Sequence, residues 1–351
     1  MITDYMWIDD NSQLEDLILS LKRDEALAFD SEFERVNTFY PKPALFQLQI
    51  DAEYYLIDMT KISNYAPLKI LLNNIILHSG SEDLEILYNL NGQLPERIFD
   101  TQIAASLCGY GLHFSYQNIV KELFDVELSK AHSRSDWMKR PLSDEQIEYA
   151  IDDVVYLSEM KQILQDKLTQ QGRMSWYDLL INQRKNAIVA SNHITKTFIN
   201  ICKSKRFKPS QQKLVLALLK WREKVAIARD KPRTWILKNT DIIDIVIKKP
   251  QSEGAFIKDI GLYARFVKHN IKDLLGLYQL AEKYDEAQLP RFDKLSPEQG
   301  NAFNAMKQEL AEKCEALNIP ASLVINVSDL KSLAAAGKTL EEIELWRLIN
   351  S

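Results

Sequence analysis

A change in the spacing of apolar residues along the chain constrains the fold most. Short apolar runs typical of strands occur near the N-terminus, at 26–29, 44–50 and 54–58. We expect the first 60 or so residues to form strands, and the short turn 51–53 favours antiparallel pairing. The later spacing is helical, broken by the apolar run 75–78, and from about residue 175 it indicates helices alone. The sequence therefore predicts an α/β fold, a mixed sheet covered by helices, followed by an all-α helical bundle.

Length and composition narrow the class of protein. A chain of 351 residues predicts two or three domains. Cys108, Cys202 and Cys314 are too widely spaced for a disulfide framework or a zinc site, as expected in a reducing compartment. The N-terminus has neither a basic leader nor a long apolar run, and no stretch approaches about 20 apolar residues. We expect a cytoplasmic protein without a membrane span.

Charge is distributed unevenly along the chain. Residues 1–200 contain 18 Lys and Arg against 30 Asp and Glu, whereas residues 201–290 contain 19 against 10. A basic segment joined to a carboxylate-rich one suggests a polyanionic partner. The alternative is that surface charge simply varies between domains.

Asp30 and Glu32 are the first candidate site residues. They end an apolar run at i and i+2, so on a strand their side chains share one face. Two carboxylates this close repel one another unless a cation lies between them, and oxygen ligands suit Mg²⁺ or Mn²⁺ better than zinc. Taken alone, an acidic strand end that enters solvent is the better explanation of the pair.

A helix beginning at Ser143 carries the second pair of candidates. Ser143 and Gln146 have the spacing of a capping box. Tyr149 and Asp153 are one turn apart on one face of this helix. Asp152 is a competing ligand at this level of analysis.

Two further aspartates have alternative explanations as helix caps. Asp83 opens a predicted helix after the apolar run 75–78, and Asp100 follows Phe99. Carboxylates in a first helical turn commonly interact with the helix dipole. Asp100 is a reserve candidate should Asp83 be only a cap, and His78 is expected to fix the local backbone.

No glycine-rich phosphate loop occurs among the ten glycines, which disfavours a P-loop enzyme.

The order of these pieces resembles the DEDD exonuclease superfamily, and more closely ribonuclease D. The resemblance spans roughly residues 20–165 and is carried by Phe29-Asp30-Ser31-Glu32, His78-Ser79-Gly80-Ser81-Glu82-Asp83, Phe99-Asp100-Thr101-Gln102, Ser135-Asp136-Trp137-Met138-Lys139-Arg140-Pro141-Leu142 and Glu148-Tyr149-Ala150-Ile151-Asp152-Asp153. It implies a ribonuclease H-like sheet, with Asp30, Glu32, Asp83 and Asp153 as ligands of two Mg²⁺ or Mn²⁺ ions. Tyr149 would orient the attacking water in a two-metal hydrolysis that releases nucleoside monophosphates.

The helical half resembles the HRDC domain over about 208–285. Its basic residues would supply a non-specific phosphate-binding surface. They are Lys203, Lys205, Arg206, Lys208, Lys213, Lys220, Arg222, Lys224, Arg229, Lys231, Arg233 and Lys238. Trp221 and Trp235 could stack on bases, although tryptophans at helical spacing among Leu and Ile are more typical of a core.

The resemblances predict a domain order and a function. We expect an exonuclease domain at 1–170, a helical connector at 171–207, an HRDC-like domain at 208–288 and a second, short HRDC-like domain at 295–351. The expected activity is 3′-5′ exoribonuclease action on RNA 3′ ends, with tRNA precursors as substrates, by a monomer. The alternatives are a 3′-5′ DNA exonuclease and a catalytically inactive nucleic-acid-binding adaptor.

Overall fold

The computed structural model describes residues 4–21, 26–129, 135–190, 193–290 and 295–351. These form two units, which are described separately. Unit 1 comprises Met1–Glu34, Pro41–Ala190 and Lys294–Ser351, and unit 2 comprises Arg35–Tyr40 and Ser191–Asp293.

A six-stranded mixed sheet forms the centre of unit 1. Its strands are β1 (Met6–Ile8), β2 (Leu27–Glu34), β3 (Lys42–Ile50), β4 (Glu53–Asp58), β5 (Asn74–Leu77) and β6 (Arg97–Asp100). The order is β1-β4-β3-β2-β5-β6; β2, β3 and β4 pair antiparallel, and the other neighbours pair parallel. The predicted antiparallel meander and mixed sheet are confirmed.

A helix in the N-terminal segment corrects the prediction that the first 60 residues form strands. Helix α1 (Asn11–Ser20) begins at Asp10, whose carboxylate accepts hydrogen bonds from the backbone N–H of Ser12 at 2.8 Å and of Gln13 at 2.9 Å. Leu14 and Leu17, one turn apart, are buried. This capping residue and the i, i+3 spacing were present in the sequence as a helix signal.

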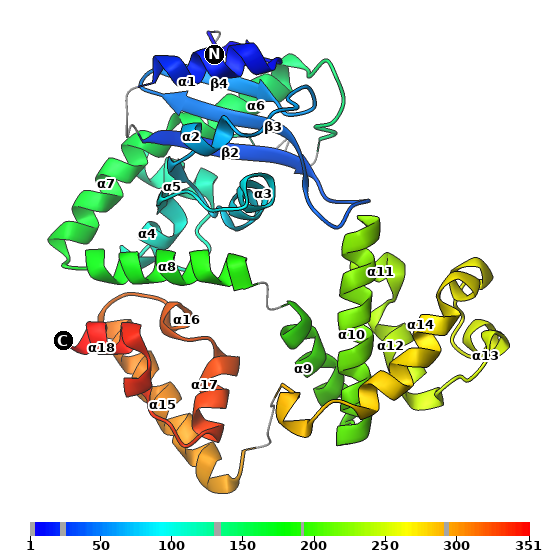
Figure 1. The fold of residues 1–351 in the computed structure, drawn as a ribbon. Coiled ribbons are helices and arrows are strands. Elements are labelled where there is room, and N and C mark those ends of the chain that lie inside the picture. Colours follow the sequence, from blue (N-terminus) through cyan, green and yellow to red (C-terminus); the bar gives the residue numbers. More distant parts are fainter. Residues whose placement is uncertain (1–3, 22–25, 130–134, 191–192, 291–294) are drawn as a thin grey trace. The chain divides into compact units, whose positions relative to one another are not determined.

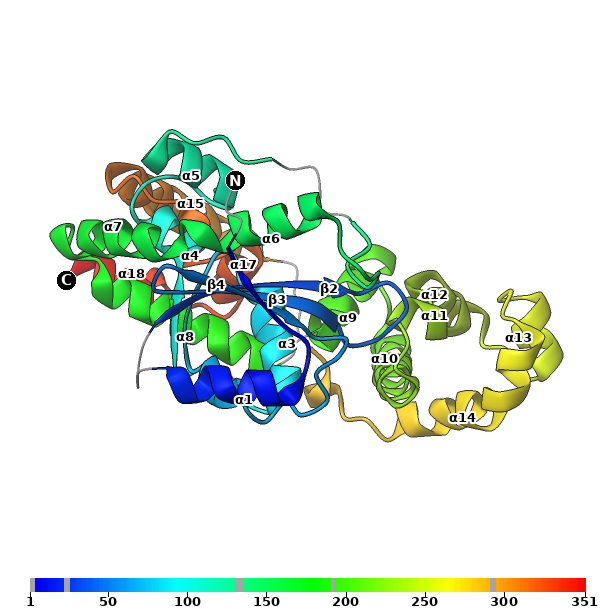
Figure 2. The same ribbon diagram turned by 90° about the horizontal axis from the view of Figure 1, so that it is seen from above.

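Helices cover both faces of the sheet. They are α2 (Leu68–Leu71), α3 (Ser81–Asn91), α4 (Thr101–Leu107), α5 (Tyr116–Phe124), α6 (Asp144–Val155), α7 (Leu157–Gln170) and α8 (Met174–Ala190). In Figure 2 the strands β2 and β3 lie between α1 and α3 on one side and α6 on the other. Helix α6 packs directly on β2 and β3.

The C-terminal helices complete unit 1. They are α15 (Pro297–Ala316), α16 (Ala321–Val324), α17 (Val327–Ala335), the 3₁₀ helix η2 (Leu340–Glu342) and α18 (Glu344–Asn350). Helix α18 lies beside α8 (Figure 1). The Arg173 guanidinium donates a hydrogen bond to the carbonyl of Leu317 at 2.8 Å and another to the carbonyl of Leu107. This buried arginine therefore ties the C-terminal helices to α4.

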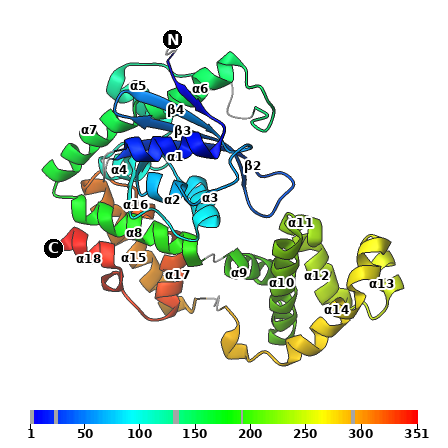
Figure 3. The same ribbon diagram turned by 45° about the horizontal axis from the view of Figure 1, so that its top comes forward.

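Unit 2 is a helical bundle arranged around α10. Its elements are α9 (His193–Lys205), α10 (Pro209–Arg229), α11 (Arg233–Ile236), α12 (Asn239–Lys248), α13 (Glu253–Lys258), α14 (Ala264–Glu282) and the 3₁₀ helix η1 (Glu286–Gln288). Helix α10 packs against α9, α11, α12 and α14 (Figure 3). The prediction of helices alone after residue 175 is confirmed for the described residues.

The segment Arg35–Tyr40, which connects β2 and β3, belongs to unit 2. The Asp230 carboxylate accepts a hydrogen bond from the Phe39 backbone N–H at 2.9 Å. The Arg233 guanidinium lies 4.3 Å from the centre of the Phe39 ring. These contacts make Phe39 part of the apolar core of unit 2.

None of the helices in the described ranges combines the length and the apolar character that a bilayer-spanning segment requires.

Candidate active site

Asp30 and Glu32 lie on one face of β2. The antiparallel register places Asp30 opposite Gln47 and Glu32 opposite Leu45 on β3. Opposed residues of an antiparallel pair point to the same side of a sheet, so all four face α6. The strand positions predicted from the sequence are confirmed.

Helix α6 carries Tyr149 and Asp153 over this face. The predicted capping box is present, since the Gln146 N–H donates to the Ser143 hydroxyl at 3.3 Å and the Ser143 N–H donates to the Gln146 side chain at 3.1 Å. Ala150 and Ile151 pack against Leu45 of β3, which sets the rotation of the helix about its axis.

Asp153 joins the two strand carboxylates. Carboxylate oxygens of Asp30, Glu32 and Asp153 all lie within 4.8 Å of one another. The Tyr149 hydroxyl donates a hydrogen bond to the Asp153 carboxylate. The centre of the Tyr149 ring lies 6.0 Å from the centre of the Trp137 ring. Among the described residues, Asp152 lies outside this group, so the geometry favours Asp153 over Asp152.

Asp83 approaches from the opposite side of β2. It lies in the first turn of α3 and is buried, and its carboxylate accepts a hydrogen bond from the Ser31 hydroxyl. Asp83 is not one of the three grouped carboxylates. Its negative charge nevertheless contributes to the raised pKa values of Asp30 and Glu32, after the larger effect of burial. The four predicted ligands thus form a close group of three with Asp83 at its margin.

Asp100, the reserve candidate, has the contacts of a structural residue. It caps α4 by accepting from the Gln102 N–H at 2.9 Å, and it pairs with Arg184 at 3.1 Å in a fully buried position. His78 is similarly occupied, because its Nε2 bonds to the Phe114 carbonyl at 3.0 Å and its Nδ1 contacts the Thr101 hydroxyl at 2.9 Å. Both residues fix backbone segments beside the site.

Burial and mutual repulsion raise the pKa values of these four carboxyl groups. Burial is the largest cause in every case. It raises the pKa of Asp83 to about 6 and that of Asp153 to about 7, although a hydrogen bond from Ser31 or Tyr149 acts in the opposite direction. Burial and the charges of Asp153 and Asp83 raise the pKa of Glu32 to about 9, and the pKa of Asp30 is raised well above its usual range. A bound cation would relieve this repulsion.

The donor set fits a divalent metal ion. Three grouped carboxylates offer the hard oxygen ligands that Mg²⁺ and Mn²⁺ prefer. Gln47, opposite Asp30, is fully buried, and within the described residues neither its amide nitrogen nor its amide oxygen has a partner. Buried polar atoms without partners are rare and often mark functional sites. Gln47 is not among the residues predicted from the sequence, although a polar residue within an apolar strand was the available signal.

Two of the basic residues expected to bind phosphate form contacts within unit 2 instead. Arg222 is buried and donates to the Leu237 carbonyl at 3.1 Å, so its expected role in phosphate binding is wrong. Arg233 forms an ion pair with Glu223 at 2.6 Å.

Trp221 is a core residue, as expected, whereas Trp235 is 57% exposed and contradicts the expectation of a core position.

The sheet and its carboxylate group lie in the part of the chain that matches 3′-5′ exonucleases. Residues 5–169 match the 3′-5′ exonuclease family, and residues 211–278 match the HRDC domain. Enzymes of this exonuclease class use divalent metal ions, in agreement with the grouped carboxylates.

The chain belongs to the ribonuclease D family. It is 30% identical to ribonuclease D of Shewanella sp. (strain ANA-3), over 91% of this chain and 84% of the relative. It is 30% identical to that of Escherichia coli (strain K12), over 94% of this chain and 89% of the relative. The crystal structure of Escherichia coli RNase D, described as an exoribonuclease involved in structured RNA processing, is similar with a TM-score of 0.85 at 28% identity. The similarity covers 95% of this chain and 91% of the Escherichia coli chain. The chain is therefore a hydrolase of the 3′-5′ exoribonuclease class.

Proposed function

We propose that this protein removes nucleotides from the 3′ ends of structured RNA, with tRNA precursors as the substrate class. The observation that carries the proposal is the approach of Asp30, Glu32 and Asp153 to within 4.8 Å beneath α6. A structured-RNA substrate is supported by the described role of the Escherichia coli relative.

Asp30, Glu32, Asp83 and Asp153 are proposed to hold two divalent ions, Mg²⁺ or Mn²⁺. Such ions, when bound, make a hydroxide nucleophile available near pH 7 and offset the charge of the phosphodiester. Asp83 would bind a metal ion from the edge of the group, where the Ser31 hydroxyl orients the Asp83 carboxylate.

Tyr149 is proposed to position the attacking water. Burial and the surrounding carboxylates raise the pKa of Tyr149 above its ordinary value, so its hydroxyl keeps its proton at neutral pH. That proton is directed at Asp153, and a phenolic oxygen can both donate a hydrogen bond and accept one, here from the attacking water. Attack at phosphorus displaces the 3′ oxygen of the penultimate nucleotide, and a nucleoside 5′-monophosphate is released.

The test is hydrolysis of a 5′-end-labelled RNA and of the matching DNA in Mg²⁺ or Mn²⁺, with Asp153→Asn and Asp152→Asn in parallel. We expect stepwise release of nucleoside monophosphates from RNA, abolished by Asp153→Asn and preserved by the matched neighbour Asp152→Asn. Preference for the DNA would favour a DNA exonuclease. Binding of RNA without hydrolysis would favour an inactive adaptor. Loss of activity in Asp152→Asn alone would reassign the ligand on α6.

We also propose the domain order expected from the sequence, with boundaries at 1–170, 171–207, 208–288 and 295–351. Support for a second HRDC-like domain comes from the repeated element order. Helices α15, α16 and α17 have lengths of 20, 4 and 9 residues, close to the 21, 4 and 10 of α10, α11 and α12. Helices α15, α16 and α17 belong to unit 1, together with the sheet.

The protein is further proposed to act as a monomer in the cytoplasm. Cys108, Cys202 and Cys314 are free and buried, which suits a reducing compartment. Sedimentation of the purified chain would test the monomer, since a dimer would sediment at about twice the mass.

A further inference from the structure

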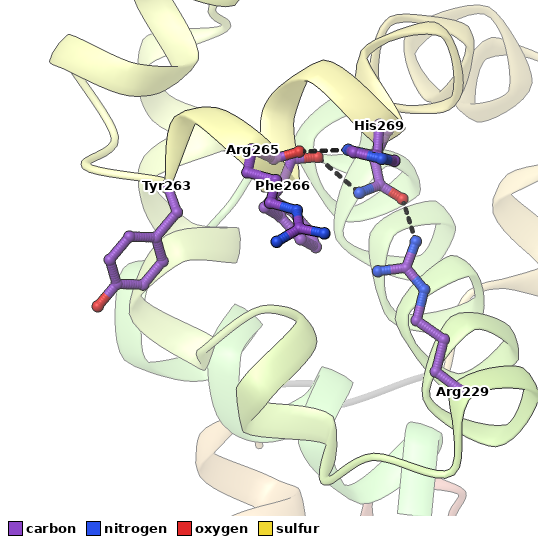
Figure 4. Close-up of a pocket in the computed structure, with 6 residues that line it drawn as sticks. Arg229, Tyr263, Arg265, Phe266 and His269 are labelled. Atoms are coloured by element: carbon purple, nitrogen blue, oxygen red, sulfur yellow. Dashed lines mark hydrogen bonds between the residues drawn. The ribbon is translucent and has the colours of Figure 1, made fainter.

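A hollow of about 420 Å³ lies in unit 2 between the end of α10 and the first two turns of α14 (Figure 4). Its lining residues are Arg229, Tyr263, Arg265, Phe266, His269 and Asn270. None of the six carries a carboxylate, and two are permanently charged guanidinium groups. The hollow is therefore positively charged.

Contacts within the wall hold Arg229 in place. The buried Asn270 side chain donates to the Phe266 carbonyl at 2.6 Å and accepts a hydrogen bond from the Arg229 guanidinium at 2.9 Å. Since Asn270 is only 3% exposed, its orientation is fixed by packing. One N–H of Arg229 is thereby anchored, and in the described part of the chain its guanidinium forms no ion pair, so its other N–H groups can donate to a ligand.

Arg265 contributes further donors to the hollow, and His269 lies one turn further along α14. The His269 Nδ1 bonds to the Arg265 carbonyl at 2.7 Å, so Nδ1 carries the proton and Nε2 faces away from the backbone. The Arg265 guanidinium is exposed and forms no ion pair with any described residue. Guanidinium groups without an acidic partner are well suited to phosphate.

Tyr263 stands at the rim of the hollow with 87% of its surface exposed. It is the N-cap residue of α14, but its side chain makes no capping hydrogen bond. In Figure 4 its ring extends away from Arg265 and the other lining residues. An aromatic ring that neither packs in a core nor caps a helix offers a free face for a nucleobase.

We propose that this hollow binds one unpaired nucleotide of the RNA substrate. Its phosphate would lie between Arg229 and Arg265, and its base would stack on Tyr263. A base-paired nucleotide is stacked on both sides and has no face to offer, so the site selects single-stranded segments. This inference rests on the proposed function for the nature of the polymer, and it adds a contact remote in sequence from the carboxylates.

The experiment measures binding of the full-length protein to a fluorescent, unpaired RNA oligonucleotide, by anisotropy, with EDTA present to prevent hydrolysis. We expect Tyr263→Ala to weaken binding about tenfold, and Tyr263→Phe, which keeps the ring, to bind like wild type. Arg265→Ala should weaken binding and lower the slope of log affinity against log salt by about one. The matched control is Lys268→Ala, an exposed cation on α14 that does not line the hollow.

Two results would overturn the assignment. One is wild-type affinity in both Tyr263→Ala and Arg265→Ala. The other is an equal loss in Lys268→Ala, which would indicate a diffuse basic surface. A fully paired RNA should bind equally well to wild type and Tyr263→Ala, and a loss there would contradict selection of unpaired nucleotides. Failure of the proposed function is distinguished separately, because it would appear as no hydrolysis of RNA by wild type in Mg²⁺.

Discussion

The hydroxyl of Ser31 donates a hydrogen bond to the carboxylate of Asp83 at 2.5 Å. Ser31 lies on β2 between Asp30 and Glu32, and Asp83 lies in the first turn of α3. Adjacent strand residues point to opposite faces, so one tripeptide supplies two carboxylates to the α6 side and a hydroxyl to the α3 side. This bond links the position of Asp83 to the strand that carries the grouped carboxylates.

Removal of that hydroxyl should destabilise the fold. In Ser31→Ala the buried Asp83 loses a charge-assisted partner, and we expect the free energy of unfolding to fall by about 1–3 kcal/mol. Urea denaturation of wild type and Ser31→Ala measures this difference in the free energy of unfolding. Adding Asp83→Asn should recover part of the loss, because no buried charge is left without a partner. An unchanged urea midpoint in Ser31→Ala would show that the bond contributes nothing.

Stability without metal should fall as pH rises. The folded-state pKa of Glu32 is about 9 against an ordinary value of 4.5, so between these values the native state binds more protons than the unfolded state. Stability then decreases with pH across that window. Thermal unfolding of the EDTA-treated protein would show a declining midpoint, flattened in Glu32→Gln. Added Mg²⁺ should restore stability most at the alkaline end, where the carboxylates are ionised. A midpoint that rises with pH would contradict the proximity of these groups.

Tyr149→Phe should lower kcat by about 100-fold if the hydroxyl positions water. Burial keeps this hydroxyl protonated, so the dependence of kcat on pH should keep its shape in the variant. A changed alkaline limb would instead indicate a general base. The control is Tyr156→Phe, at the end of α6, whose ring stacks on Phe124 and lies outside the carboxylate group; it should retain activity.

Asp100 and Asp153 should respond oppositely to replacement. Asp100→Ala removes the partner of Arg184 and the cap of α4, and we expect a loss of about 3–5 kcal/mol in unfolding free energy. Asp153→Asn removes one of several crowded carboxylates, so the metal-free fold should be at least as stable as wild type while activity is lost. Calorimetry in EDTA measures the unfolding of both variants and distinguishes these two expected results. Equal destabilisation would make Asp153 a structural residue as well.

Local patterns explain why much of the fold was predictable. The alternation along 44–50 and the capping box at Ser143 and Gln146 each depend on neighbours a few residues away, and β3 and α6 formed where expected. The missed helix α1 is also a local pattern, since Asp10 precedes Leu14 and Leu17 at helical spacing. That error arose from extending the strand pattern of the adjacent segments.

Exposure, in contrast, depends on contacts between distant residues. Trp221 and Trp235 have similar surroundings in the sequence, yet one is 8% and the other 57% exposed. Gln47 occupies a polar position in an alternating strand, where a surface residue is expected, but α6 covers that face and buries it completely. Alternation distinguishes the two faces of a strand without indicating what packs on either.

The sequence by itself determined which carboxylates were available and on which strand or helix each would lie. It determined that Asp30 and Glu32 share a face, because side chains alternate along a strand with a period of two. Only the tertiary structure brought Asp153, and not its neighbour Asp152, within 4.8 Å of them, and placed Asp83 against Ser31. Neighbouring residues of a helix point about 100° apart, so the packing of Ala150 and Ile151 on β3 decides which aspartate faces the strand.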